Sequence, residues 1–182
     1  MALTTYTAGE VLTAASLNDN FTFAAANPIS KIVQVVSTTL TTTYTMSSTS
    51  YATITSLTAT ITPTLDTSKI LVIGTLSAVG NTGVSRATSR LIRDSTAIGV
   101  GTSASSRVAG TAAIPISGAT GDIYSMGLTF LDSPASTSAL VYGIQVRVND
   151  SGTVYVNRSE NDSDNSSYSR PICTITVMEI LA

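Results

Sequence analysis

The stretch Leu140-Val141-Tyr142-Gly143-Ile144-Gln145-Val146-Arg147-Val148 decides the fold class of this 182-residue chain. Bulky apolar residues recur at every second position, and Gly143, Gln145 and Arg147 stand between them. Successive side chains of a strand point to opposite faces of a sheet, so this alternation predicts a strand with one buried and one polar face. Residues 124–130 alternate in the same way and predict a second strand.

Seven further segments have strand character and are bounded by Gly, Pro, Asp, Asn or Ser. They are Ile32–Val36, Leu40–Met46, Tyr51–Thr62, Lys69–Val79, Arg86–Arg93, Gly152–Asn157 and Ile172–Leu181. Strand follows strand without helical patterns between them. This order predicts an all-β fold, an antiparallel β-sandwich of jelly-roll type.

The first 30 residues have a different pattern. Apolar residues recur at helical spacing after Thr13, which is a suitable N-cap, and Pro28 ends the pattern. We therefore expect a short helix over Ala14–Ala26 within an N-terminal arm of residues 1–30, followed by a β-sandwich domain of residues 31–182. The helix either packs on its own domain or docks onto another protein.

The polar residues are mostly hydroxyls rather than charges. The chain has 31 Thr and 26 Ser, whereas Asp, Glu, Lys and Arg make up 11% of it. A hydrophobic content of 43% and a net charge of −2 exclude intrinsic disorder. Strands faced with Thr and Ser lack the Lys and Glu that protect sheet edges from pairing. We therefore expect edges covered by identical neighbours in a compact homo-oligomer.

Several kinds of partner are not expected. With 2 Lys, 7 Arg and a pI near 4.8, the chain has no basic cluster for nucleic acid. No apolar run approaches the roughly 18 residues of a membrane helix, and no basic region opens a secretory signal. We expect a protein without membrane insertion that is made in the cytoplasm.

The sequence also predicts no enzyme. Histidine is absent, which removes Ser-His and Cys-His pairs and His-ligated zinc. Cys173 is expected to be a buried small hydrophobe. No catalytic, cofactor-binding or metal-binding residue is predicted, and we expect no cofactor. Seven aspartates are interpreted as turn formers: Asp66, Asp94, Asp122, Asp132, Asp150, Asp162 and Asp164.

Asn161-Asp162-Ser163-Asp164-Asn165 leaves two interpretations open. Its oxygens suit calcium, although the glycine and the bidentate glutamate of an EF-hand loop are missing. The other interpretation is a solvated hairpin tip.

The opening Tyr6-Thr7-Ala8-Gly9-Glu10-Val11-Leu12-Thr13-Ala14-Ala15-Ser16-Leu17-Asn18-Asp19-Asn20-Phe21 resembles the start of many tailed-bacteriophage fibre and appendage proteins. Later stretches are similar to a small β-domain of virion proteins of aquatic phages: Ile32–Thr39, Ile61–Pro63 leading to Ser68–Val72, Phe130–Pro134 and Ile175–Ile180. The resemblance implies a trimeric virion protein whose arm joins the particle and whose β-domain points outward.

On this resemblance, Leu12, Leu17 and Phe21 are the expected virion-docking residues, and other virion proteins are their partners. A short tail fibre or tail appendage is the first expectation. A capsid decoration protein or head fibre is the alternative, because no shaft separates the arm from the β-domain. A polysaccharide depolymerase is a weaker alternative, since it would need a carboxylate pair about 5–10 Å apart.

A host contact would fall on the polar loop between Arg158 and Arg170. A cell-surface glycan is the expected ligand, and aromatic faces commonly stack on sugars. Tyr168, flanked by Ser and Asn, is expected to be exposed there. The candidate host-contact residues are Asn161, Asp162, Asp164, Asn165 and Tyr168.

Overall fold

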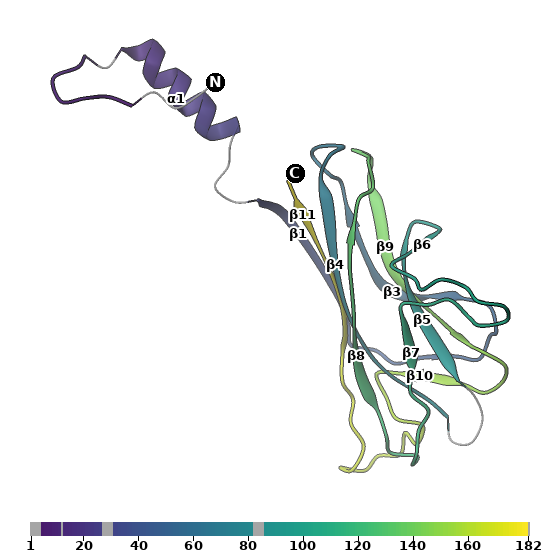
Figure 1. The fold of residues 1–182 in the computed structure, drawn as a ribbon. Helices are drawn as coiled ribbons and strands as arrows, with labels where there is room; N and C mark the ends of the chain where they lie inside the picture. Colours follow the sequence, from purple (N-terminus) through teal and green to yellow (C-terminus); the bar gives the residue numbers. More distant parts are fainter. Residues whose placement is uncertain (1–4, 12, 27–30, 82–85, 182) are drawn as a thin grey trace. The chain divides into compact units, whose positions relative to one another are not determined.

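A computed structural model describes residues 5–11, 13–26, 31–81 and 86–181. The chain forms two compact units, Met1–Lys31 and Ile32–Ala182. Eleven strands and one helix are present within the described ranges, and every pairing between named strands is antiparallel (Figure 1). The predicted all-β, antiparallel class is confirmed.

The first unit contains the helix α1, Ala14–Ala26, as predicted. Thr13 is its N-cap, because its hydroxyl accepts the Ser16 amide at 3.2 Å and its carbonyl accepts the Leu17 amide at 3.0 Å. Before the helix, the Glu10 carboxylate accepts both the amide and the hydroxyl of Thr7, at 3.0 and 3.1 Å. The arm is therefore ordered by its own local hydrogen bonds.

One sheet of the β-domain contains six strands: β1 (Ile32–Leu40), β11 (Cys173–Ile180), β4 (Lys69–Gly80), β10 (Val154–Val156), β2 (Tyr44–Met46) and β8 (Tyr124–Asp132). β8 pairs along one edge of β4, so β11 and β10 share its other edge, one after the other. On the far edges of these two strands, β1 pairs with β11 and β2 pairs with β10. The sheet is thus four strand positions wide.

The other sheet contains five strands: β3 (Ala52–Ile61), β9 (Leu140–Val148), β5 (Ala87–Arg93), β6 (Thr96–Ile98) and β7 (Ala112–Ile114). β9 occupies one edge of β5 along its whole length, and β6 and β7 share the other. The alternating apolar residues of β9 point into the core as predicted: Tyr142, Ile144 and Val146 are fully buried.

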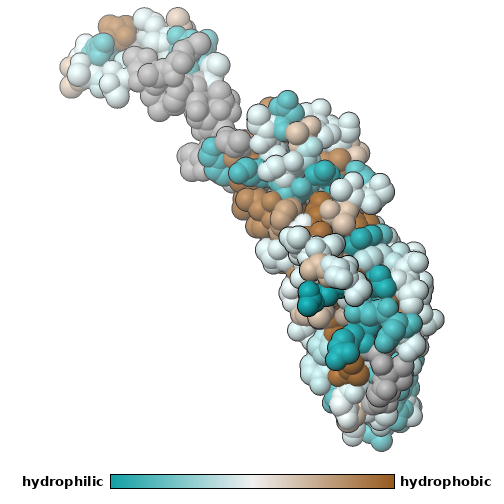
Figure 2. Space-filling model, turned by 45° about the vertical axis from the view of Figure 1, so that its right-hand side comes forward, coloured by the Kyte–Doolittle hydropathy of each residue, from teal (hydrophilic) through white to brown (hydrophobic). Residues whose placement is uncertain are grey.

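The two sheets face each other around a single apolar core (Figure 1). Ile54, Leu76, Leu91, Leu128 and Ile175 come from five different strands, and each is fully buried. Complete burial of such a side chain stabilises the fold by roughly 1.5–3 kcal/mol. On the side of the β-domain seen in Figure 2, much of the surface is pale, the colour of weakly polar residues, and brown apolar residues gather in part of it.

A buried carboxylate connects the two sheets. Asp132, the last residue of β8, accepts hydrogen bonds from Arg93 Nη1 at 2.6 Å and from the Tyr142 hydroxyl at 2.8 Å. Burial, and then the hydrogen bond to Asp132, raise the pKa of Tyr142 far above its ordinary value. The interpretation of Asp132 as a simple turn former was wrong: its position ends a strand, but its carboxylate lies between the sheets.

A second buried carboxylate fixes the turn between β3 and β4. Glu179 Oε1 accepts the Thr64 amide at 2.7 Å, the Thr64 hydroxyl at 2.6 Å and the Ser68 hydroxyl at 2.7 Å. Burial alone would raise the pKa of Glu179, but these hydrogen bonds together hold it below its ordinary value. The stretches Ile61–Pro63, Ser68–Val72 and Ile175–Ile180 therefore meet in the fold.

Two predicted strand boundaries were wrong. Ile32–Val36 and Leu40–Met46 are instead β1, which runs to Leu40, and β2, which begins at Tyr44. The short strands β6 and β7 were not predicted. Asp94, with φ 53°, forms the two-residue turn from β5 to β6, so its interpretation as a turn former is confirmed.

Candidate functional site

The loop between β10 and β11 leaves the sheet and returns to the same edge of β4. Asn157, with φ 57°, donates its backbone amide to Ser77 O at 2.9 Å, and the Ser77 amide donates to Cys173 Sγ at 3.2 Å. The Cys173 thiol in turn donates to Asn157 Oδ1 at 2.9 Å. Both ends of the loop are therefore fixed on one residue of the central strand.

Asn157 also stabilises the break between β1 and β2. Its side-chain amide donates to Leu40 O at 2.8 Å and to Thr42 O at 3.0 Å. Cys173 is fully buried, as predicted, and burial raises the pKa of its thiol. The thiol is thus protonated at neutral pH and acts as a packing and hydrogen-bonding group rather than as a nucleophile.

Two arginines brace the loop through one aspartate. Arg158 Nη1 lies 3.2 Å from Asp162 Oδ2, and Arg170 Nη2 lies 2.6 Å from Asp162 Oδ1. Arg158 also donates to the carbonyls of Ser159 and Glu160, at 3.0 and 2.8 Å. These bonds hold the beginning and the end of the loop together.

Tyr168 is half-buried, so the expectation that it is exposed was wrong. Its hydroxyl accepts a hydrogen bond from the Asn161 side-chain amide at 2.8 Å. A Cβ atom added at Gly121 would lie 3.2 Å from the Tyr168 ring, so the ring packs closely against this glycine. The backbone amide of Asn161 donates to Thr120 O at 2.8 Å. The loop therefore rests on the turn that contains Thr120 and Gly121.

The loop encloses an open cavity of about 290 Å³. Its lining residues are Asp162, Ser163, Asp164, Asn165, Tyr168 and Arg170. Four of the five predicted host-contact residues thus line one cavity, and Asn161 supports it through Tyr168. Acceptor oxygens and a guanidinium are groups that hydrogen-bond a polyhydroxylated ligand.

The calcium interpretation of this loop fits its geometry poorly. Both carboxylate oxygens of Asp162 already face guanidinium groups. Within the described ranges, no three His, Cys, Asp or Glu side chains lie together as a metal cluster. A hard cation here would have to displace two arginines for one shared carboxylate.

The arm exposes apolar side chains. Phe21 is 65% exposed and Leu17 is 37% exposed, while Val11 lies on the segment before the helix and is 82% exposed. Leu12, the third predicted docking residue, lies outside the described residues. Phe21 and Leu17 stand four residues apart, so both project from the same side of α1.

An aromatic and basic cluster on the outer face of the second sheet was not predicted. Arg90 Cζ lies 3.8 Å and Arg147 Cζ 5.6 Å from the Tyr51 ring centre, and the Tyr51 hydroxyl donates to Ala109 O at 2.6 Å. Burial raises the pKa of Tyr51 and the two arginines lower it, with a net rise. The sequence contained one indication of this cluster: in the alternating pattern of their strands, both arginines occupy positions that point away from the core. Tyr51 precedes β3 and belongs to neither strand, so no local pattern connected it to them.

Comparison with known proteins adds no relative: no family model and no curated protein matches this sequence. In the part of the chain that the structure describes, no helix has the length and apolar character to span a membrane.

Proposed function

We propose that the chain is a structural virion protein of a tailed bacteriophage, a short trimeric tail appendage with a jelly-roll-type β-domain. The arm attaches to other virion proteins, and the β-domain stands outward. The observation that carries the proposal is the arm, a separate unit whose local hydrogen bonds order it while Val11, Leu17 and Phe21 stay exposed. Exposed apolar residues gathered in one small unit are typical of a docking surface.

The loop between β10 and β11 is the proposed host-contact surface. Its cavity is lined by hydrogen-bonding groups and by Tyr168, and two ion pairs to Asp162 hold the loop in shape, which suits a cell-surface glycan. The residues within β1 and β11 that resemble virion β-domains lie side by side, and β1 begins directly after the arm. This short connection supports a compact appendage, and it serves a capsid decoration protein equally well.

Incorporation into particles tests the docking role. Phe21→Asp places a charge where the proposal requires an apolar contact, so incorporation of the protein should fall strongly. Asn18→Asp is the matched control, since it adds the same charge at an exposed polar position of α1. Immunoblots of purified particles measure the difference. Equal incorporation of both variants would refute docking through this side of the helix.

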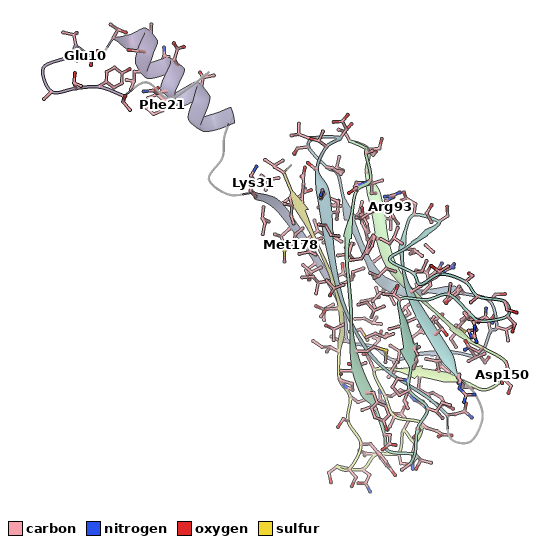
Figure 3. The ribbon with its side chains drawn as sticks, in the orientation of Figure 1. Glu10, Phe21, Lys31, Arg93, Asp150 and Met178 are labelled. Atoms are coloured by element: carbon pink, nitrogen blue, oxygen red, sulfur yellow. The ribbon has the colours of Figure 1, made fainter. Side chains whose placement is uncertain are left out.

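Electron microscopy with gold-labelled antibody tests the virion role itself and separates tail from capsid. Label at the tail supports the appendage, label over capsid faces supports decoration, and particles without label overturn the virion proposal. Host contact is tested with particles carrying Asp164→Asn, which should adsorb less to cells than particles carrying Asp150→Asn. Asp150 is exposed in another loop (Figure 3), so equal adsorption would remove the cavity from the proposal.

A further inference from the structure

The outer face of the β1–β11–β4–β8 sheet carries an apolar row that crosses all four strands. Strand register aligns Val35 with Met178, Met178 with Leu71 and Leu71 with Leu131. Val35 is 55% and Leu131 45% exposed, and both lie on the outer strands of this set. Figure 3 shows Met178 on the side of β11 that faces away from β3 and β9.

On one side of the apolar row, Ile180 pairs with both Ile32 and Lys69. On its other side the neighbouring rows contain hydroxyls and one more apolar residue. The next row is Ser37, Thr176, Ile73 and Thr129, and the one after it is Thr39, Thr174, Thr75 and Gly127. Hydroxyls already bond one another across the strands, as Ser37 and Thr176 do at 2.8 Å. Among the described outward residues of these four strands, Lys69 at the end of β4 is the only charged one.

We propose that this face is the surface through which copies of the chain associate. The inference deepens the proposed function, because it rests on its self-association. A second copy is the occupant that the charge pattern favours: in the proposed trimer, part of this face packs against another part of the same face on the next copy, and apart from Lys69 at its end no charge is buried there. A partner with an ordinary charged surface would lose hydration there without gaining an opposite charge.

The other sheet offers a less suitable outer face. It presents Arg90 and Arg147 beside Tyr51, and the Tyr51 hydroxyl is bonded to Ala109 in the segment between β6 and β7. Arginines of neighbouring copies brought together on this face would repel one another. The β1–β11–β4–β8 face has one described charge, Lys69, and it lies at the end of β4.

The size of the face matches a small stable interface. Four strands about 4.8 Å apart, and six steps of about 3.4 Å rise from Lys69 to Thr75, give a face of about 19 by 20 Å. It projects to about 400 Å², and the corrugation of the side chains raises the accessible area further; Ser77, two residues farther along β4, is buried and ends the face. The smallest stable interfaces bury about 600 Å² per partner. The hydroxyl rows must therefore take part with the apolar row.

The test compares charge placed on the two outer faces of the full-length protein. Val35→Glu and Leu131→Glu change exposed residues of the proposed interface, and Val141→Glu is the matched control, 38% exposed on β9. Light scattering at micromolar concentration should give oligomer mass for the wild type and the control, and monomer mass for the other two. Unchanged circular dichroism establishes that the variants fold.

Thiol labelling tests the interface without adding charge. The natural Cys173 is fully buried, so Leu131→Cys and Val141→Cys each add one accessible thiol. Maleimide should label position 131 at least tenfold more slowly than position 141, and dilution to monomer should remove the difference.

Three outcomes overturn the inference. Oligomers that persist in Val35→Glu and Leu131→Glu would place the contact elsewhere and leave the proposed function intact. A monomeric wild type would refute self-association, while the antibody labelling of particles still decides the virion role. Protection of position 131 that survives dilution and disappears when residues 1–31 are deleted would make the arm the occupant of this face.

Discussion

The Asp132 carboxylate provides a sharp test of how the two sheets are held together. We predict that Asp132→Ala destabilises the β-domain because it removes the acceptor of two hydrogen bonds at once. Tyr142 is fully buried, so its hydroxyl would lose its partner without gaining water. Arg93 keeps 23% of its side chain exposed and would regain part of its hydration.

The expected loss of unfolding free energy is about 2–4 kcal/mol. An orphaned buried hydroxyl costs about 1–3 kcal/mol. The partly solvated contact with Arg93 adds only about 1 kcal/mol, since solvent screens it. For a domain of this size such a loss lowers the melting temperature by roughly 4–16 °C.

A double-mutant cycle with Tyr142→Phe isolates the orphaned hydroxyl. Tyr142→Phe alone should cost about 1 kcal/mol, because Asp132 keeps its bond to Arg93. In the double variant no hydroxyl is orphaned, so its destabilisation should fall at least 1 kcal/mol short of the sum of the single effects.

Urea unfolding followed by circular dichroism at one fixed protein concentration measures the four proteins of this cycle. Asp122→Ala is the control, since Asp122 accepts hydrogen bonds only from exposed groups, the Gly118 and Ala119 amides and the Tyr124 hydroxyl, and its loss should cost less than about 1 kcal/mol. Strictly additive effects of Asp132→Ala and Tyr142→Phe would refute the role assigned to the hydroxyl bond.

Three further predictions concern the β3–β4 turn and the loop. Glu179→Gln should lower the melting temperature at neutral pH. Because the pKa of Glu179 in the folded protein lies below its ordinary 4.5, the extra stability of the wild type is present above pH 4.5 and shrinks as the pH falls through the folded pKa. Melting curves of both proteins at pH 7 and pH 3 measure this change. Equal differences at both pH values would contradict this. Asn157→Ala removes three side-chain hydrogen bonds and should lower the unfolding free energy by about 2–3 kcal/mol in urea titrations. Gly121→Val should loosen the loop through a clash with Tyr168, seen as faster amide exchange over residues 158–170 without a change in the core strands; an unaltered exchange pattern would dismiss that packing.

Period-two alternation in the sequence was sufficient to predict the sheets. In β9 the alternation marked the buried face directly, and the Thr-rich β3 kept enough apolar positions to be recognised. The breaks in the strands were not predictable in this way. Asn157 and Cys173 are sixteen residues apart, and the interruption of β1 at Leu40 depends on a side chain 117 residues away.

The loop cavity was predicted in part because aspartate and asparagine cluster there in sequence. The contacts that hold the loop in shape could not be predicted, because they come from residues outside this cluster. Tyr168 is positioned by Gly121, 47 residues earlier, and Asp162 by an arginine on each side of the loop. Asp132 was misinterpreted for a similar reason, since its two partners come from the opposite sheet.

The attachment of Asn157 and Cys173 at Ser77 makes the segment between them, residues 158–172, exchangeable. Both flanking residues are bonded to this one residue of β4, so the sheet continues past the loop as if it contained a single interrupted strand. The sequence between the ends can be lengthened, shortened or replaced while all other strand pairs keep their register. Under the proposed host-contact role, a change of ligand would need changes in this segment alone and would leave the rest of the domain unaltered.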